Sequence, residues 1–141
     1  MKSTTTIFIL DDDRYFGNFI LRSLKDDFAD VTYFQTEQEC IDALSQKPDI
    51  LILDHDLNDC TGLDILSEVQ RICGPSTNVI YLSAQEHVHV TVRALRSGAL
   101  EYLEKGSSTV NAIAHSIRKI ERLTHQFTRP LNIQAYRAES S

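Results

Sequence analysis

The sequence DILILD at residues 49–54 decides the fold, because a run of Ile and Leu ends directly in an acid. Such an unbroken apolar run demands burial on both faces, which is typical of a central strand in a parallel sheet. A second apolar run, IFIL at residues 7–10, also ends in acids, namely Asp11, Asp12 and Asp13. If both runs are parallel strands, their acids meet at one edge of the sheet.

Carboxylates gathered at one sheet edge repel one another. Each raises the pKa of its neighbours unless a cation neutralises the cluster, and oxygen ligands of this kind suit a divalent metal such as Mg²⁺. The acidic strand ends therefore suggest a metal site, and they are the first clue to function.

Length and composition predict one compact domain. The chain has 141 residues, of which 42% are hydrophobic and 24% charged, as is usual for a globular protein. No apolar run approaches the roughly 20 residues of a membrane helix, and the N-terminus lacks a secretory signal, so we expect a cytoplasmic protein. The net charge of -6 argues against direct nucleic-acid binding by this chain. No CxxC pair occurs, and free thiols are expected at Cys40, Cys60 and Cys73.

Short apolar runs alternate with longer stretches of helical period, which is typical of repeated β-α units around a parallel sheet. Strands are expected at residues 5–10, 31–35, 49–53, 78–82 and about 100–103. Helices are expected at about residues 14–25, after Thr36, from Gly62 to Cys73, at about 86–96 and up to about 123. Thr36 and Glu39 form a predicted capping box, and Asp13 is a predicted helix cap. The polar tail at residues 124–141 has no clear period and is interpreted as a linker or a loosely packed extension.

Residues that carry chemistry stand at the carboxyl ends of the expected strands, where the loops of an open parallel sheet form a crevice. They are Asp11, Asp12, Asp54, Ser83 and Lys105. Carboxylates bind Mg²⁺, whereas a lysine or a small hydroxyl binds a phosphate. A carboxylate among them can also be a nucleophile that forms an aspartyl phosphate. The set indicates phosphate chemistry at one sheet edge.

Over about residues 5–123 the chain resembles the receiver domain of two-component response regulators. The resemblance rests on ILDD at 9–12, LD at 53–54 followed by TGL at 61–63, YLSA at 81–84, SGA at 97–99 and YLEK at 102–105. Each motif alone is weak, but five in this order are specific. The resemblance implies an α/β fold with a five-stranded parallel sheet in the order 2-1-3-4-5, doubly wound with five helices and flavodoxin-like. It places the receiver domain at residues 1–123.

The resemblance also implies a role for each acid. Asp54 matches the phosphoacceptor, and Asp11 and Asp12 match the pair that holds Mg²⁺. The backbone carbonyl of Asp56 would supply a further metal ligand. The phosphoryl donor would be a histidine kinase or a phosphotransfer protein, so such a protein is the expected partner. The chain would then catalyse only its own phosphorylation and dephosphorylation, and it would not be an enzyme in the usual sense.

Three further residues match the family's switch. Lys105 matches the invariant lysine, which neutralises charge on the phosphoryl group. Ser83 matches the hydroxyl residue that turns toward that group, and Tyr102 matches the aromatic residue that moves inward with it. Phosphorylation would then change the surface of the fourth helix, fifth strand and fifth helix. Whether the chain also forms a homodimer stays open from the sequence.

The sequence departs from the family pattern at two loops. Asn58 stands where many relatives have proline, and Asp56 adds a carboxylate two residues after the acceptor. We hypothesise that Asp56 changes the lifetime of the phosphorylated state. Gly106 follows Lys105 where the family usually has proline, often after a cis bond. Because a cis bond without proline costs roughly 2.5–4 kcal/mol, we predict a trans peptide there.

Two other functions remain open from the sequence. Asp54-His55-Asp56 after an apolar strand also resembles the nucleophile motif of haloacid-dehalogenase-like Mg²⁺-dependent phosphatases. Against that alternative, Asp54 lies on the third expected strand rather than the first, and the chain is short. The second alternative is a pseudo-receiver that binds partners without phosphorylation. The complete set of acids, hydroxyl and lysine speaks against it.

Overall fold

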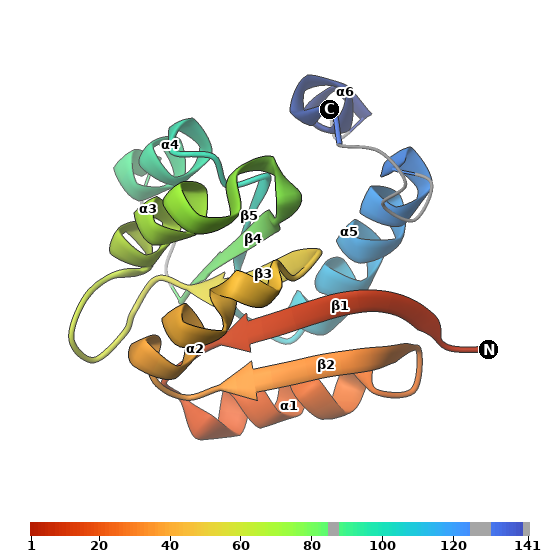
Figure 1. Ribbon diagram of the computed structural model, residues 1–141, viewed down its shortest axis with the longest axis horizontal. Coiled ribbons are helices and arrows are strands. Elements are labelled where there is room, and N and C mark those ends of the chain that lie inside the picture. The colour runs from red at the N-terminus through yellow and green to blue at the C-terminus, as the bar shows by residue number, and fades with distance from the viewer. Residues whose placement is uncertain (85–87, 125–130, 140–141) are drawn as a thin grey trace.

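The computed structural model describes residues 1–84, 88–124 and 131–139. Its centre is a five-stranded sheet with the order β2-β1-β3-β4-β5, in which every pairing is parallel (Figure 1). The strands are β1 (Ser3–Leu10), β2 (Phe28–Phe34), β3 (Ile50–Asp54), β4 (Asn78–Ser83) and β5 (Glu101–Glu104). This is the predicted fold and strand order. The apolar run that ends at Asp54 is the central strand.

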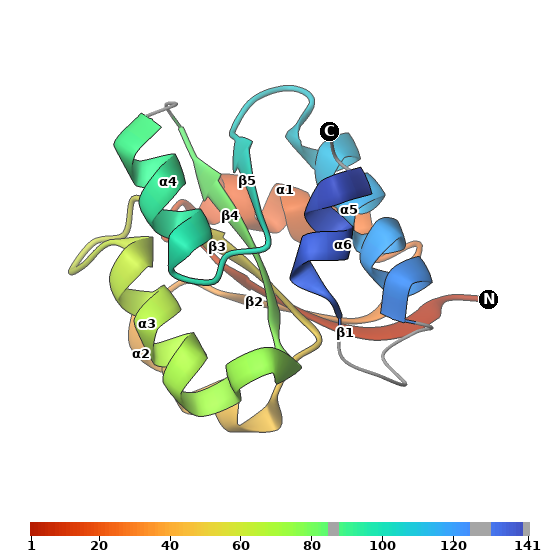
Figure 2. The same cartoon turned by 90° about the horizontal axis from the view of Figure 1, so that it is seen from above.

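Helices cover both faces of the sheet (Figures 1 and 2). They are α1 (Arg14–Leu24), α2 (Glu37–Ala43), α3 (Gly62–Cys73), α4 (Val88–Arg96), α5 (Thr109–Thr124) and α6 (Ile133–Glu139). Helices α1 and α5 pack on one face, and α2, α3 and α4 pack on the other. The predicted start of the fourth helix near residue 86 lies outside the described residues.

The alternation of side chains along the central strand produces two separate cores. Leu51 and Leu53 pack with α2, α3 and α4, whereas Ile50 and Ile52 pack with α1 and α5. All four side chains are at most 1% exposed. Successive side chains of a strand point to opposite faces, so a strand that is buried on both sides has to be apolar at every position.

Local capping sets the start of the helices as the sequence indicated. The carboxylate of Asp13 accepts hydrogen bonds from the backbone amides of Tyr15 and Phe16 and so caps α1. The hydroxyl of Thr36 accepts from the backbone amide of Glu39 and caps α2. These bonds satisfy amides that have no partner within the helix. The predicted caps are confirmed.

The structure has one α-helix more than the five predicted. Residues 133–139 of the polar tail form α6, and Tyr136 of this helix is 1% exposed. The side chain of Asn132 caps α6 by accepting from the backbone amide of Ala135 at 3.0 Å. The helix has seven residues, which is too few for an apolar period to be visible in the sequence. Its position depends on tertiary contacts.

Two smaller predictions about the chain are also confirmed. The described residues contain no cis peptide bond, so the bond between Lys105 and Gly106 is trans. All three cysteines are free, with Cys40 and Cys73 buried and Cys60 partly exposed. Within the ranges given above, no helix combines the length and the apolar character needed to cross a membrane.

We predict that Gly62→Ala destabilises the fold. A Cβ atom at Gly62 would lie 2.5 Å from the backbone oxygen of Asp54 and 2.7 Å from the hydroxyl of Tyr81. Forcing an extra carbon into such a packed position costs about 1–3 kcal/mol. Denaturant unfolding measures this loss. Gly106→Ala is the matched control, because a Cβ there meets no atom within 4 Å. Equal stability of the two variants would contradict the prediction.

Candidate functional site

Three predicted residues meet at the carboxyl edge of the sheet. The ammonium of Lys105 lies 2.8 Å from Oδ2 of Asp11 and 3.2 Å from Oδ1 of Asp54. Asp11 follows β1, Asp54 ends β3, and Lys105 follows β5, so three strands deliver these groups. Both carboxylates are buried, with Asp11 1% and Asp54 2% exposed. The result is a partly buried cation between two buried acids.

Asp12 completes an acidic cluster with these two carboxylates. Ligand oxygens of Asp11, Asp12 and Asp54 all lie within 4.8 Å of one another. In the part of the chain that the structure describes, Oδ2 of Asp11 and Oδ1 of Asp54 each pair with the Lys105 ammonium and have no further hydrogen-bond donor. Buried oxygens with spare capacity of this kind fit a hard cation such as Mg²⁺, which takes oxygen ligands.

Burial and the charge of Asp11 raise the pKa values of Asp12 and Asp54. The pKa of Asp54 is raised to about 7, first by burial and then by the charge of Asp11, against the opposing effect of Lys105. Burial and Asp11 likewise raise the pKa of Asp12. Burial alone would lower the pKa of Lys105, but the hydrogen bond and charge of Asp11, together with Asp54, raise it. Lys105 is therefore stabilised as a cation, whereas the charged forms of Asp12 and Asp54 are disfavoured.

Hydrogen bonds from neighbouring residues and strands fix Asp11 and Lys105. The hydroxyl of Tyr33 donates to the backbone oxygen of Asp11 at 2.6 Å, and the amide of Asp13 donates to its carboxylate at 2.9 Å. The amide of Lys105 donates to the backbone oxygen of Ser83 at 2.8 Å. The Lys105 ammonium also lies 4.7 Å from the centre of the Phe16 ring, within the range of a cation–π contact.

The two predicted switch residues lie at different distances from this cluster, with Ser83 hydrogen-bonded to Lys105 through the backbone and Tyr102 farther away. Ser83 is the last residue of β4, is 1% exposed and pairs with Glu104 of β5. Tyr102 is half-buried in β5, and its ring stacks on that of Tyr81 with centroids 6.0 Å apart. Tyr102 is therefore one layer away from the carboxylates, on the side of β5 that faces α4.

Asp56 lies in the loop after the acceptor strand, and its side chain is exposed. Its backbone amide donates a hydrogen bond to the carboxylate of Asp54, which lowers the pKa of Asp54. Asp56 also forms an isolated antiparallel bridge with Thr61, which closes the loop. The loop is thus tied at both ends. The metal-ligand role of the Asp56 carbonyl stays a prediction.

The sequence did not predict the contact that His55 makes. Nδ1 of His55 lies 2.6 Å from the hydroxyl of Tyr81, and the two ring centroids are 5.7 Å apart. His55 follows Asp54 directly, and Tyr81 in turn stacks on Tyr102. No local pattern links His55, just after β3, to Tyr81 of β4, which is 26 positions away, although a tyrosine among the apolar residues of that strand was a signal worth noting.

Comparison with known proteins identifies the family. The response regulator receiver domain model matches residues 7–118. The chain is 30% identical over 110 residues to the luminescence regulatory protein LuxO of Vibrio campbellii and 30% identical over 125 residues to the transcriptional regulatory protein KdpE of Staphylococcus aureus. These matches cover 73% and 86% of this chain, but only 23% and 53% of the two relatives. The chain belongs to the response regulator receiver domain family.

Solved structures agree on the fold. The signal receiver domain of a LuxO repressor protein from Vibrio parahaemolyticus superposes with a TM-score of 0.74 at 22% identity, covering 97% of this chain and 95% of that one. A CheY-like receiver domain protein from Methanospirillum hungatei gives a TM-score of 0.77 at 22% identity, covering 88% and 97%. The family is a signalling module, which removes the haloacid-dehalogenase alternative. The observed strand order, with Asp54 on the third strand, agrees.

We predict that Asp54→Asn stabilises the metal-free chain at neutral and alkaline pH. The folded chain binds the Asp54 proton more tightly than the unfolded chain does, because the pKa rises from 3.8 to about 7 on folding. Asp54 therefore lowers stability progressively as pH rises from about 4 to about 7. In chelator at pH 8 we expect the variant to melt about 3–6 °C higher than the wild type, and the difference to shrink toward pH 5.

Differential scanning calorimetry at both pH values checks this expectation. Asp30→Asn is the matched control, because Asp30 is exposed on the edge strand β2. The control should leave the melting temperature within about 1 °C of the wild type. A melting temperature that falls at pH 8 in Asp54→Asn contradicts the prediction.

Proposed function

We propose that this chain is a phosphoacceptor switch, in which Asp54 accepts a phosphoryl group from a histidine kinase or a phosphotransfer protein. One observation carries the proposal: the Asp54 carboxylate is buried at the sheet edge within 3.2 Å of the Lys105 ammonium and beside two further acids. Such a carboxylate is a nucleophile in a fixed position, next to a cation that neutralises incoming phosphate charge.

The other residues of the cluster would position the phosphoryl group and neutralise its charge. We assign Asp11, Asp12 and the backbone carbonyl of Asp56 as the ligands of Mg²⁺. The ion would supply positive charge for the phosphoryl oxygens. Lys105, which pairs with both Asp11 and Asp54, would supply a second positive charge beside the acceptor. Catalysis of the transfer is then mainly positioning and electrostatic stabilisation.

Ser83 and Tyr102 convert the charge change into a change of surface. Ser83 is the last residue of β4, so a bond from its hydroxyl to a phosphoryl oxygen would displace the end of that strand. Tyr102 on β5 stacks on Tyr81. Its ring would move inward when the Ser83 hydroxyl turns toward the phosphoryl group. The surface that changes consists of α4, β5 and α5, which we call the switch face.

The proposed context follows from the family. We place the receiver domain at residues 1–123, followed by a C-terminal extension at 124–141, in the cytoplasm. This chain spans only 23% and 53% of the two curated relatives named above. The signal would then pass to a partner protein or a further segment that binds the switch face. A homodimer is one such output. The net charge of -6 does not favour direct nucleic-acid binding by these residues.

A small phosphodonor tests the proposal directly. Incubation of the chain with acetyl phosphate and Mg²⁺ should add one phosphoryl group, seen by intact mass. Asp54→Ala should stay unmodified, and chelation of Mg²⁺ should abolish the addition in the wild type.

Asp13→Ala is the control for a nearby acid, because Asp13 caps α1 and is not part of the buried cluster. It should be modified like the wild type. A wild-type chain that never gains the phosphoryl group, even with a cognate kinase, would instead be a pseudo-receiver.

We further predict that Asp56→Asn lengthens the lifetime of the phosphorylated chain. The exposed Asp56 carboxylate stands two residues after the acceptor, where it can accept a proton from the attacking water. Its loss should slow dephosphorylation about threefold or more, measured as decay of the phosphorylated mass after removal of the donor. Asp59→Asn, an exposed acid of the same loop, is the control and should decay at the wild-type rate. Identical decay of the Asp56 variant would refute the role.

A further inference from the structure

Helix α6 occupies the switch face. It lies beside β5 and α5, between α5 and the end of α4 (Figures 1 and 2). Every residue of α6 is exposed except Tyr136, which is 1% exposed. A seven-residue helix is not stable in water alone, so α6 depends on this docking for its structure.

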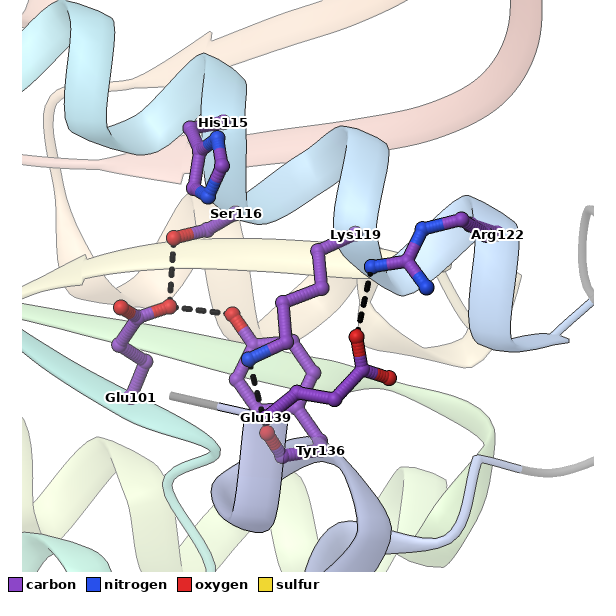
Figure 3. Close-up of a pocket in the computed structure, with 7 residues that line it drawn as sticks. All are labelled: Glu101, His115, Ser116, Lys119, Arg122, Tyr136 and Glu139. Carbon is purple, nitrogen blue, oxygen red and sulfur yellow. Dashed lines mark hydrogen bonds and ion pairs between the residues drawn. The ribbon is translucent and has the colours of Figure 1, made fainter. Parts of the chain in front are cut away.

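Tyr136 anchors α6 in a polar pocket of β5 and α5 (Figure 3). Its hydroxyl donates to the carboxylate of Glu101, which also accepts from the hydroxyl of Ser116. The ammonium of Lys119 donates to the backbone oxygen of Tyr136 at 2.8 Å and lies 4.0 Å from the centre of its ring. Lys119 is only 8% exposed. Each of these buried polar groups has a partner supplied by another element, so the cluster forms as a unit.

Arg137 ties α6 to the junction of α4 and β5. Its Nη2 donates to the backbone oxygens of Leu95 and Ala99, each at 2.9 Å. Carbonyls in the last turn of a helix lack partners within that helix, so Arg137 caps α4 from outside. A third contact, Arg122 with Glu139 at 2.9 Å, is mostly exposed and contributes little.

Side-chain contacts lead from this docking site back to Asp54. Tyr102 lines a groove together with Tyr136 and Arg137. The ring of Tyr102 stacks on Tyr81, whose hydroxyl bonds to His55, the residue next to Asp54. Two residues of α6 therefore line the same groove as Tyr102, the residue assigned to respond to phosphorylation.

We propose that α6 is a built-in ligand of the switch face, and that its docking and the phosphorylation of Asp54 oppose each other. The proposal rests on the function assigned above to Asp54. Docked α6 holds the end of α4 against β5 in the arrangement where the Asp54 carboxylate pairs with Lys105. Phosphorylation removes that pairing and moves α4 and β5. It therefore weakens the contacts that Arg137 and Tyr136 of α6 make with these elements. By linkage, if phosphorylation weakens the docking of α6 by some factor, the docking of α6 disfavours the phosphorylated state by the same factor.

Hydrogen exchange of the full chain tests the first direction. Backbone amides of α6 should exchange about fivefold or more faster after treatment with acetyl phosphate and Mg²⁺ than before it. Intact mass of the same sample reports the phosphorylated fraction. Asp54→Asn, treated identically, should show unchanged exchange, which separates the effect of phosphorylation from that of Mg²⁺ and the donor.

Substitutions in α6 test the reverse direction. Arg137→Ala removes both bonds to the α4–β5 junction, and Tyr136→Phe removes only the hydroxyl bond to Glu101. Each should speed α6 exchange in the unmodified chain and raise the phosphorylated fraction at limiting donor, Arg137→Ala by about fivefold or more. Gln134→Ala is the control, because Gln134 is exposed on the same helix, and it should match the wild type in both measurements.

The outcomes separate this inference from the function beneath it. If Asp54 is phosphorylated but α6 exchange stays unchanged or slows, the opposition between docking and phosphorylation is wrong while the phosphoacceptor function stands. Wild-type phosphorylation in an Arg137→Ala chain whose α6 exchanges faster has the same meaning. If no phosphoryl group is added to the wild type, the phosphoacceptor function fails, and the proposed opposition fails with it.

Discussion

The ammonium of Lys105 lies between the buried carboxylates of Asp11 and Asp54, and the rest of the structure depends on that contact. The two acids are at most 2% exposed, and their ligand oxygens lie within 4.8 Å of each other. They repel each other at that distance, so a cation has to lie beside them. Three parallel strands deliver these groups to one edge of the sheet. Parallel pairing in register, with Leu10 opposite Leu53, keeps the two acids side by side.

The balance of charge in this cluster is incomplete, and that is useful for a switch. One ammonium faces three carboxylates, and the pKa values of Asp12 and Asp54 are raised by burial and by Asp11. Local destabilisation of this kind is typical of functional sites, because a bound cation or a covalent modification can relieve it. The fold tolerates the cluster because the Ile and Leu residues directly behind it are buried in two cores.

Coupling from the acids to the outer face needs contacts between elements, and the structure provides a continuous set. His55 bonds to Tyr81, Tyr81 stacks on Tyr102, and Tyr102 lines the groove that α6 borders. Arg137 joins α6 to α4 at the far end of the same layer. In the switch proposed above, these contacts would transmit small movements, because the packed core leaves little free volume to absorb them.

The strands and the candidate site were predictable because their signals are local. Apolar runs that end in Asp11 or Asp54 carry both the burial of a parallel strand and the charge at its carboxyl end within a few residues. The caps at Asp13 and Thr36 span three residues or fewer and were predictable for the same reason. The strand order came from the resemblance of the motifs to a family, not from periodicity.

Helix α6 and the contact between His55 and Tyr81 were decided only by the tertiary structure. Tyr136 lies in a short polar segment, and its burial depends on Glu101 and Lys119, which are 35 and 17 residues away. The sequence by itself determined which residues end the strands and so which acids and which lysine meet at the sheet edge. Packing of distant elements determined the docking of α6. The hydrogen bonds that stabilise this helix come from residues of β5 and α5, which no local pattern contains.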